Sequence, residues 1–171
     1  IETIDYPLWP KVKEGMTQNL LTHTLDHFIF YWPSPMKIFP SNTQDDSKVL
    51  FFSSEHSLVQ KETENSLIID PFILEHYRYE NQMREQFVLG AIFEGELYGY
   101  YTAGKSQSTK IIVIPDELCI SNYMEDFQAI RFLTNVLLYF QNKKDLILLK
   151  NKTQSQSNFK SIVHEKIQRE Q

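Results

Sequence analysis

Cysteine and glycine are both scarce in this chain of 171 residues, which holds one cysteine and five glycines. Because a disulfide needs two thiols, the lone Cys119 excludes an internal disulfide and a cysteine-rich zinc motif. The scattered glycines form neither a phosphate-binding loop nor a dinucleotide fingerprint, and none flanks a serine in the Gly-x-Ser-x-Gly pattern of a nucleophile elbow. We therefore expect no cofactor and no nucleotide-binding loop.

Long apolar runs and clusters of basic residues are missing as well. A membrane-spanning helix needs about 20 consecutive apolar residues, and no such run is present. The net charge is -5 and the sequence pI is near 5.5. Sequence-independent binding to phosphate backbones needs a stripe of basic residues, and the sequence has none. We therefore expect that nucleic acid is not a partner.

What the chain does have is enough apolar material for one folded domain. Hydrophobic residues make up 42% and aromatic residues 13% of the sequence, which at this length buries a proper core. We therefore predict a single α/β domain over residues 1–171, with a polar tail at 153–171. Because the sequence opens at Ile1 without a methionine, we also expect it to be a fragment of a larger protein.

Residues 110–142 give the strongest structural signal. The β-branched run at 111–114 is closed by a proline, which is typical of a buried strand. It is followed by a periodic segment at 126–142, which predicts an amphipathic helix. We expect the strand to lie in the interior of a sheet and the helix to lie flat across it. The apolar face that should be buried comprises Phe127, Ile130, Leu133, Leu137 and Phe140.

Four further apolar runs complete the predicted sheet. Residues 48–52 and 87–93 are apolar on successive positions, as in strands that are covered on both faces. Residues 97–102 follow a break at Glu94-Gly95-Glu96, so this region is either a hairpin or one long bulged strand. Residues 146–149 are expected to form a final strand. Together these elements predict a mixed, mostly parallel sheet with flanking helices, in a Rossmann-like or flavodoxin-like arrangement.

Polar side chains follow two of these strands. If the two strands are parallel neighbours, the side chains converge in the crevice beyond the carboxyl ends of the strands, where open α/β sheets usually bind ligands. Serine, histidine and aspartate together would also fit a serine hydrolase. Serine, aspartate and asparagine equally serve as ordinary helix caps and turn residues. The residues concerned are Ser53, Ser54, Glu55, His56, Asp116, Ser121 and Asn122.

Two histidines, His23 and His27, stand four residues apart with Asp26 beside them. On a helix this spacing would place both imidazoles on one face, and two histidines with a carboxylate can bind zinc. The sequence lacks the His-Glu-x-x-His motif, so an ordinary surface or interface role is the alternative. We predict no metal site.

A group of aromatic residues near the N-terminus allows two interpretations. The rings either pack in the core or line a surface that binds sugars or a protein partner. The group comprises Tyr6, Trp9, Phe28, Phe30, Tyr31 and Trp32.

Several short motifs, taken in order, resemble those of one protein family. Tyr-Pro-Leu-Trp-Pro occupies residues 6–10, Lys-Val-Leu-Phe-Phe-Ser-Ser-Glu-His-Ser occupies 48–57, and Phe-Glu-Gly-Glu-Leu-Tyr-Gly-Tyr-Tyr occupies 93–101. Residues 111–121 follow as a strand with an aspartate loop, and 132–140 as a helix with leucine and asparagine. In this order they resemble the auxiliary component of gliding-motility-type ABC transporters. A related α/β architecture occurs in an intraflagellar-transport subunit and in glutamine-amidotransferase-like domains.

The resemblance implies a function without catalysis. It implies a non-enzymatic, extracytoplasmic domain of a membrane-anchored auxiliary protein, which binds substrate or partner subunits. The implied partners are the ABC permease and the ATPase, and the membrane is reached only through segments outside this sequence. The candidate ligand-binding residues are Ser53, Ser54, Glu55, Asp116, Ser121 and Asn122. The rival hypotheses are a serine hydrolase that uses Ser53 or Ser54 with His56 and Asp116, and a purely structural scaffold.

Overall fold

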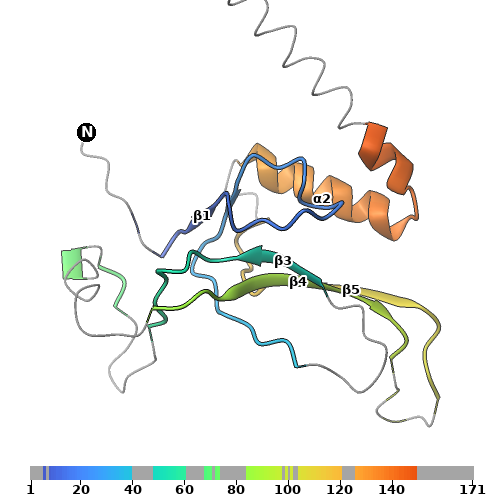
Figure 1. Ribbon diagram of the computed structural model, residues 1–171, viewed down its shortest axis with the longest axis horizontal. Coiled ribbons are helices and arrows are strands. Elements are labelled where there is room, and N and C mark those ends of the chain that lie inside the picture. Colours follow the sequence, from blue (N-terminus) through green and yellow to red (C-terminus); the bar gives the residue numbers. More distant parts are fainter. Residues whose placement is uncertain are drawn as a thin grey trace, which may run out of the picture.

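The computed structural model describes Tyr6 and residues 8–39, 48–60, 68–70, 72–73, 84–97, 99, 101, 104–120 and 126–149. This part of the chain contains a two-stranded and a three-stranded sheet, both antiparallel, and a long helix (Figure 1). The strands are β1 (Lys11–Val12), β2 (Phe28–Ile29), β3 (Lys48–Phe52), β4 (Val88–Gly95) and β5 (Thr109–Val113). The long helix is α2 (Phe127–Phe140), and residues 72–73 and 144–149 are also helical. The single domain over 1–171 stays a prediction, and its tail at 153–171 lies outside the described residues.

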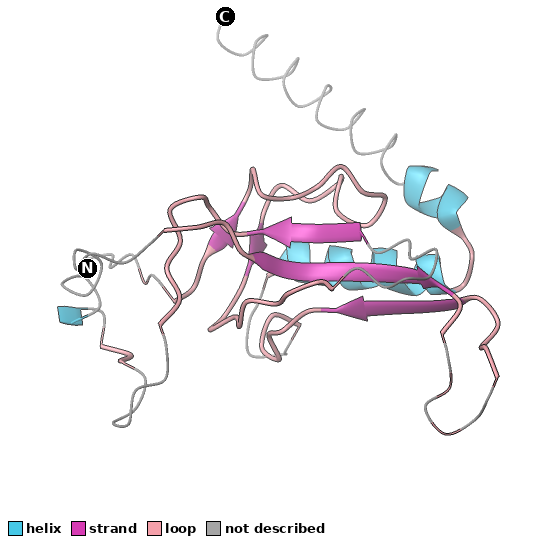
Figure 2. Ribbon diagram, turned by 60° about the horizontal axis from the view of Figure 1, so that its bottom comes forward, coloured by secondary structure: helices cyan, strands magenta, loops and turns pink. Residues whose placement is uncertain are grey.

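The larger sheet has the order β3-β4-β5, and β4 pairs with both neighbours. Its register runs from Phe52↔Val88 to Lys48↔Ile92 on one side and from Ala91↔Val113 to Gly95↔Thr109 on the other. Helix α2 lies across one face of this sheet, as two views show (Figures 1 and 2). The core of the described part of the chain therefore lies between the helix and the three strands.

The predicted parallel sheet is wrong, because the strand pairs in the described part of the chain are antiparallel. The positions of the strands are largely right: residues 48–52 coincide with β3, and the other two central runs overlap β4 and β5. Beyond β4, Ser106 N–H donates to the Leu97 carbonyl at 2.7 Å, so β4 and β5 are the arms of one hairpin. A continuous apolar run indicates only that both faces of a strand are covered and does not fix its direction. The Rossmann-like or flavodoxin-like interpretation is therefore wrong.

Strand β5 lies at an edge of the described sheet and not in its interior, contrary to the prediction. Its side chains alternate: Ile111 and Val113 are exposed, whereas Ile112 packs against the core. Branched side chains fit any half-buried pleated surface, including the outer face of an edge strand. The β-branched run therefore identified a strand without revealing its place in the sheet.

Residues 146–149 are helical, which corrects the predicted final strand. Ile147 is fully buried, while Leu146, Leu148 and Leu149 are exposed. A short apolar run cannot be assigned to strand or helix by its periodicity alone. A single buried side chain among four residues fits a helical turn that contacts the core through one residue, Ile147.

Helix α2 is present as predicted, but it buries a different face. The five residues expected in the core are exposed. The buried stripe includes polar side chains that have partners: Asn135 Nδ2 donates to the Leu21 carbonyl and to Thr24 Oγ1, both at 3.1 Å. Apolar spacing selects the more hydrophobic stripe and overlooks polar residues that are buried because they are hydrogen-bonded. The buried residues are Gln128, Ala129, Phe132, Asn135, Val136 and Tyr139.

Four phenylalanines form the centre of the core: Phe28, Phe30, Phe51 and Phe132. The ring centroids of the contacting pairs lie 4.7–5.4 Å apart, mostly edge to face, which is a favourable aromatic geometry. Core packing is thus confirmed for Phe28 and Phe30. The remaining rings of the predicted aromatic group form a second cluster with edge contacts at 5.2–6.2 Å, in which Trp9 and Trp32 are exposed. Partner binding by this second cluster stays a prediction.

Candidate functional site

The carboxyl ends of β3 and β5 lie at the same end of the larger sheet, because both strands run antiparallel to β4. Ser53 directly follows β3, and Asp116 lies three residues beyond β5. Strand β4 lies between them, which separates the two strands by about 10 Å, twice the usual strand spacing. The two strands are thus parallel in direction but not neighbours, and the close convergence that we predicted for neighbouring strands does not follow.

Ser53 is a structural link between β3 and the residues before β4. It is 6% exposed, and its Oγ accepts a hydrogen bond from the Phe87 N–H at 2.8 Å and donates to the Ser54 carbonyl at 3.1 Å. The backbone N–H of Ser53 donates to the Phe87 carbonyl at 2.8 Å. The serine therefore extends the strand ladder by one residue, and its hydroxyl is occupied within the protein.

Ser54, Glu55 and His56 are exposed on the turn that follows Ser53. Ser54 Oγ lies 3.2 Å from Ser57 Oγ, and either hydroxyl can donate. A serine nucleophile needs a base within hydrogen-bond reach, about 2.6–3.2 Å. Among the described residues, the two serines form their hydrogen bonds with other groups than His56. Neither serine is therefore paired with His56 in this structure.

The buried carboxylate of Asp116 accepts hydrogen bonds from three backbone N–H groups. Its Oδ2 accepts from Tyr31 at 2.5 Å, and its Oδ1 accepts from Leu118 at 2.9 Å and from Cys119 at 3.1 Å. These bonds fasten the loop after β5 to the segment after β2, and a carboxylate with three such donors is strongly held. Burial first, and then the Asp116 charge, raises the pKa of the Cys119 thiol to about 12, so this thiol is not an activated nucleophile.

The remaining predicted ligand residues, Ser121 and Asn122, lie outside the described part of the chain. Of the other four, Ser53 and Asp116 are buried in structural hydrogen bonds, whereas Ser54 and Glu55 are exposed. Ligand binding by these six residues stays a prediction.

The two histidines and Asp26 are engaged with different parts of the molecule. His27 Nε2 lies 3.8 Å from Oδ1 of Asp126, the N-cap residue of α2. His23 Nδ1 lies 3.1 and 3.0 Å from two backbone carbonyls of the preceding turn. The Asp26 carboxylate accepts from Gln128 Nε2 at 3.0 Å. Among the described residues, no group of three metal-ligating side chains occurs.

A charged cluster at the C-terminal end of α2 was not found by sequence reasoning. Glu94 and Lys110 are paired across β4 and β5, with Lys110 Nζ 3.8 Å from Glu94 Oε1. The Tyr139 hydroxyl donates to Glu94 Oε2 at 2.5 Å, and the ammonium groups of Lys110 and Lys144 each lie 4.8 Å from the Tyr139 ring centroid. The Tyr139 hydrogen bond, together with nearby lysines, lowers the pKa of Glu94 against the opposing effect of burial. The sequence signal was a pair of opposite charges, which becomes meaningful only once the strand register is known.

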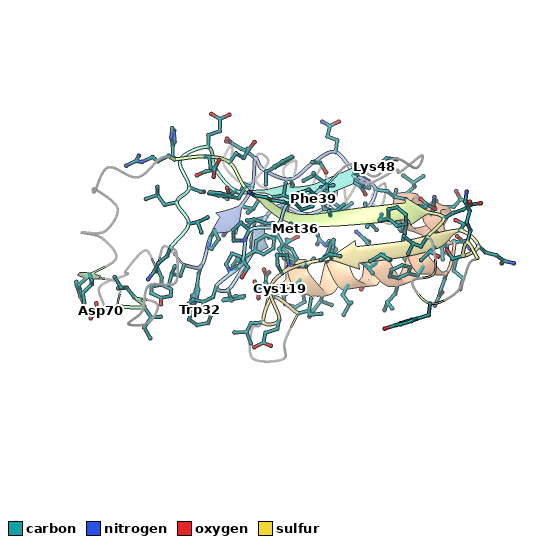
Figure 3. The ribbon with its side chains drawn as sticks, turned by 90° about the horizontal axis from the view of Figure 1, so that it is seen from below. Trp32, Met36, Phe39, Lys48, Asp70 and Cys119 are labelled. Atoms are coloured by element: carbon teal, nitrogen blue, oxygen red, sulfur yellow. The ribbon has the colours of Figure 1, made fainter. Side chains whose placement is uncertain are left out.

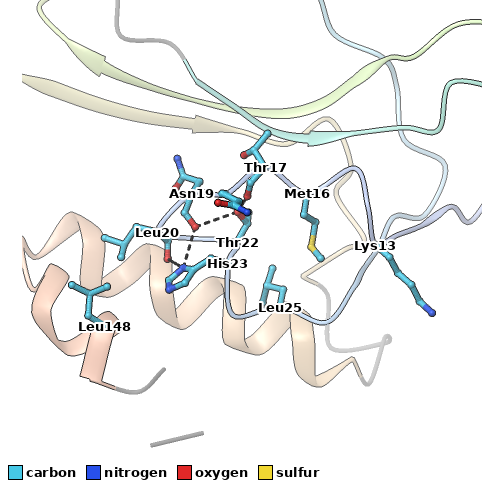
Figure 4. Close-up of a pocket in the computed structure, with 10 residues that line it drawn as sticks. Lys13, Met16, Thr17, Asn19, Leu20, Thr22, His23, Leu25 and Leu148 are labelled. Carbon is cyan, nitrogen blue, oxygen red and sulfur yellow. Dashed lines mark hydrogen bonds between the residues drawn. The ribbon is translucent and has the colours of Figure 1, made fainter. Parts of the chain in front are cut away.

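An open cavity of about 520 Å³ lies beside α2 (Figure 4). It is lined by residues between Lys13 and Leu25 and by Leu148 from the last helical segment. Its threonines are engaged within the protein: Thr17 Oγ1 donates to the Val49 carbonyl at 2.7 Å, and Thr22 Oγ1 donates to the Thr17 carbonyl at 2.6 Å. The lining of this cavity contains none of the six predicted ligand residues, and its two threonines are already hydrogen-bonded within the protein.

Comparison with known proteins identifies a family. The model of the family described as "ABC-type uncharacterized transport system" matches residues 1–149. No curated protein and no solved structure matches the chain. Within the described ranges, no helix has both the length and the hydrophobicity needed to cross a membrane. The family match spans all of the strands and helices described above.

Proposed function

The chain belongs to the auxiliary family of ABC-type transport systems, and from this premise we propose that it is a non-enzymatic domain that binds partner subunits. The observation that carries the proposal is the family match over residues 1–149. We further propose that the domain is of the gliding-motility type and belongs to a membrane-anchored protein on the extracytoplasmic side. Its partners are then the ABC permease and the ATPase, and the membrane is reached through segments outside this sequence.

Two features support binding of subunits over binding of a small substrate. The threonines that line the cavity beside α2 already have intramolecular partners. In contrast, α2 carries five exposed apolar side chains on one face. A contiguous apolar patch on a protein surface commonly marks a protein contact, whether with another subunit or with a second copy of the chain, and not a small-molecule site.

A pull-down tests the subunit assignment. The full-length protein, tagged and solubilised from its own membranes in mild detergent, should recover a permease and an ATPase subunit. An unrelated membrane protein with the same tag, from the same membranes, is the control. Recovery of neither subunit above this control would contradict the proposal.

The buried and engaged state of Ser53 and Asp116 supports a non-catalytic role. A fluorophosphonate probe, which labels activated serines, should therefore give no specific labelling of the protein. Labelling that disappears in Ser53→Ala or Ser54→Ala but persists in Ser106→Ala would show a reactive serine, and the hydrolase hypothesis would replace ours.

A thermal-shift screen distinguishes subunit binding from substrate binding. If the domain binds subunits only, sugars, peptides and nucleotides should leave the unfolding temperature unchanged. A bound ligand would be detected, because at 100 times its dissociation constant it would add about 2.7 kcal/mol of stability. A shift that is present in the wild type and lost in Lys13→Ala, at the cavity, would instead assign a small-molecule substrate.

A further inference from the structure

The outer stripe of helix α2 is the strongest unassigned feature of the molecule. We use this name for five residues whose exposed fractions are high for apolar side chains: Phe127 82%, Ile130 60%, Leu133 39%, Leu137 54% and Phe140 44%. The opposite side of the same helix is packed against the sheet. Helix α2 is therefore apolar on both sides, and the described part of the chain covers only one of them.

The spacing of the outer stripe is that of a helix–helix seam. Ile130, Leu133, Leu137 and Phe140 are separated by three, four and three residues, which is the a/d spacing of a coiled coil. The helix has one charged residue, Arg131, whose guanidinium donates to the Thr24 carbonyl at 2.9 Å. The outer stripe itself is free of charge, so it suits the apolar face of another helix.

The stripe is also nearly symmetric about its own centre. Phe127 and Phe140 are equally distant from the midpoint between Leu133 and Thr134, and Ile130 and Leu137 are as well. A twofold interface requires that when residue i contacts residue j of the second copy, j also contacts i. An antiparallel second copy meets this requirement, with Phe against Phe and Ile against Leu. Antiparallel packing also places the opposite ends of the two helix dipoles side by side.

Thr134, the polar residue nearest the centre of the stripe, already has a hydrogen-bond partner for its hydroxyl. Thr134 Oγ1 donates to the Ile130 carbonyl of its own helix at 2.8 Å. Its methyl group can therefore face Leu133 of a second copy without leaving a hydroxyl unpaired. The Thr134 hydroxyl therefore does not oppose close approach of another helix.

The area is adequate for the core of a modest dimer interface. The exposed parts of the five side chains come to roughly 400 Å², from full areas of about 100–200 Å² each. A standard interface buries about 800 Å² per partner, of which the centre is the apolar part. We propose that the outer stripe is the contact face for a second copy of the chain, in an antiparallel α2–α2 pair centred between Leu133 and Thr134.

Sedimentation equilibrium of the full chain over a range of concentrations tests the dimer. The wild type should shift from monomer to dimer, and Phe127→Glu should raise the dimer dissociation constant at least about tenfold. Phe127 is the first residue of α2, where a glutamate suits the helix dipole, so this variant should fold normally. The matched control is Phe39→Glu, since Phe39 is 80% exposed, close to the 82% of Phe127, and lies on the other side of the sheet from α2 (Figures 1 and 3). A wild type that stays monomeric at all concentrations, or an equal effect of both variants, would overturn the proposal.

A charge exchange tests the antiparallel register. Ile130→Glu should abolish the dimer, because it places a carboxylate against Leu137 of the second copy. The double variant Ile130→Glu with Leu137→Lys should restore association to within about tenfold of the wild type. Positions 130 and 137 lie about 10 Å apart along one helix, so a rescuing ion pair can form only between two copies. Failure of the rescue would overturn this register. Loss of the permease or ATPase from the pull-down in Ile130→Glu, with a monomeric wild type, would assign the stripe to a transporter subunit instead.

Discussion

Replacing Phe132 with alanine should destabilise the fold far more than replacing Phe127, although both residues lie on helix α2. Phe132 is 2% exposed, and its ring centroid lies 5.3 Å from that of Phe28 and 5.4 Å from that of Phe51. Truncation of such a ring removes apolar burial and leaves a cavity, at a cost of about 3–5 kcal/mol. Phe127 is 82% exposed, so its replacement should change the free energy of unfolding by no more than about 0.5 kcal/mol.

The assay is urea unfolding followed by the fluorescence of Trp9 and Trp32. Low protein concentration keeps any second copy from contributing to the stability of the wild type. The Phe132→Ala variant should also unfold about 10 °C lower than the wild type, given the usual entropy of unfolding for a chain of this size. If Phe127→Ala costs as much as Phe132→Ala, or more, the orientation of the helix described here is wrong.

Three further predictions concern the sheet, its charged cluster and the lone thiol. Gly15→Ala should lower the free energy of unfolding by about 1–3 kcal/mol in urea unfolding, because a Cβ there would collide with a β3 carbonyl. Gly104→Ala, with open space around it, should be neutral, and an equal effect would contradict the close approach. The pKa of Glu94 is lowered, so its carboxylate stabilises the fold above the ordinary value of 4.5, and the effect is lost as the pH falls through the lower folded value. The stability difference between wild type and Glu94→Gln should therefore shrink on acidification through that range, and a pH-independent difference would refute this. Cys119, with a pKa raised to about 12, should resist a thiol reagent until urea unfolds the protein, and rapid labelling of the native state would contradict its burial.

The positions of the main elements could be predicted because local spacing determines them. The strand at 48–52 has the bounds of β3, and the helix predicted at 126–142 contains α2. Asp126 caps this helix by accepting from the Gln128 N–H at 2.9 Å, which is why the helix begins where the periodic segment begins. Capping and periodicity are properties of neighbouring residues, so a sequence reveals them directly.

Strand direction and helix orientation depend on distant residues, and this is where prediction failed. Strands β4 and β5 are antiparallel because the chain turns back after β4. The apolar run of a strand does not indicate the direction of the strand that follows it. The buried face of α2 contains Asn135, which finds partners in Leu21 and Thr24 more than one hundred residues away. The sequence of the helix does not indicate those partners. A prediction from hydrophobicity alone therefore places the more apolar outer stripe in the core.

The surroundings of the candidate site could not be predicted from the residue types, and ligand binding there stays a prediction. The carboxyl ends of β3 and β5 do lie at one end of the sheet, but the two strands are not the parallel neighbours that we predicted, because β4 lies between them. The intervening strand, and the backbone N–H groups that occupy Asp116, could not be foreseen from the residue types. The charged cluster of Glu94, Lys110 and Tyr139 was missed for the same reason, because its members meet only through strand register and helix packing.

Thiol labelling of helix α2 tests the central claim most directly. The Ile130→Cys and Val136→Cys variants place a thiol on the exposed and on the buried side of the helix, where the native residues are 60% and 9% exposed. In dilute native protein, the thiol of the Ile130→Cys variant should react at least about 100-fold faster, since reaction of the other requires opening of the core. Equal rates, or faster reaction of the Val136→Cys variant, would contradict the account.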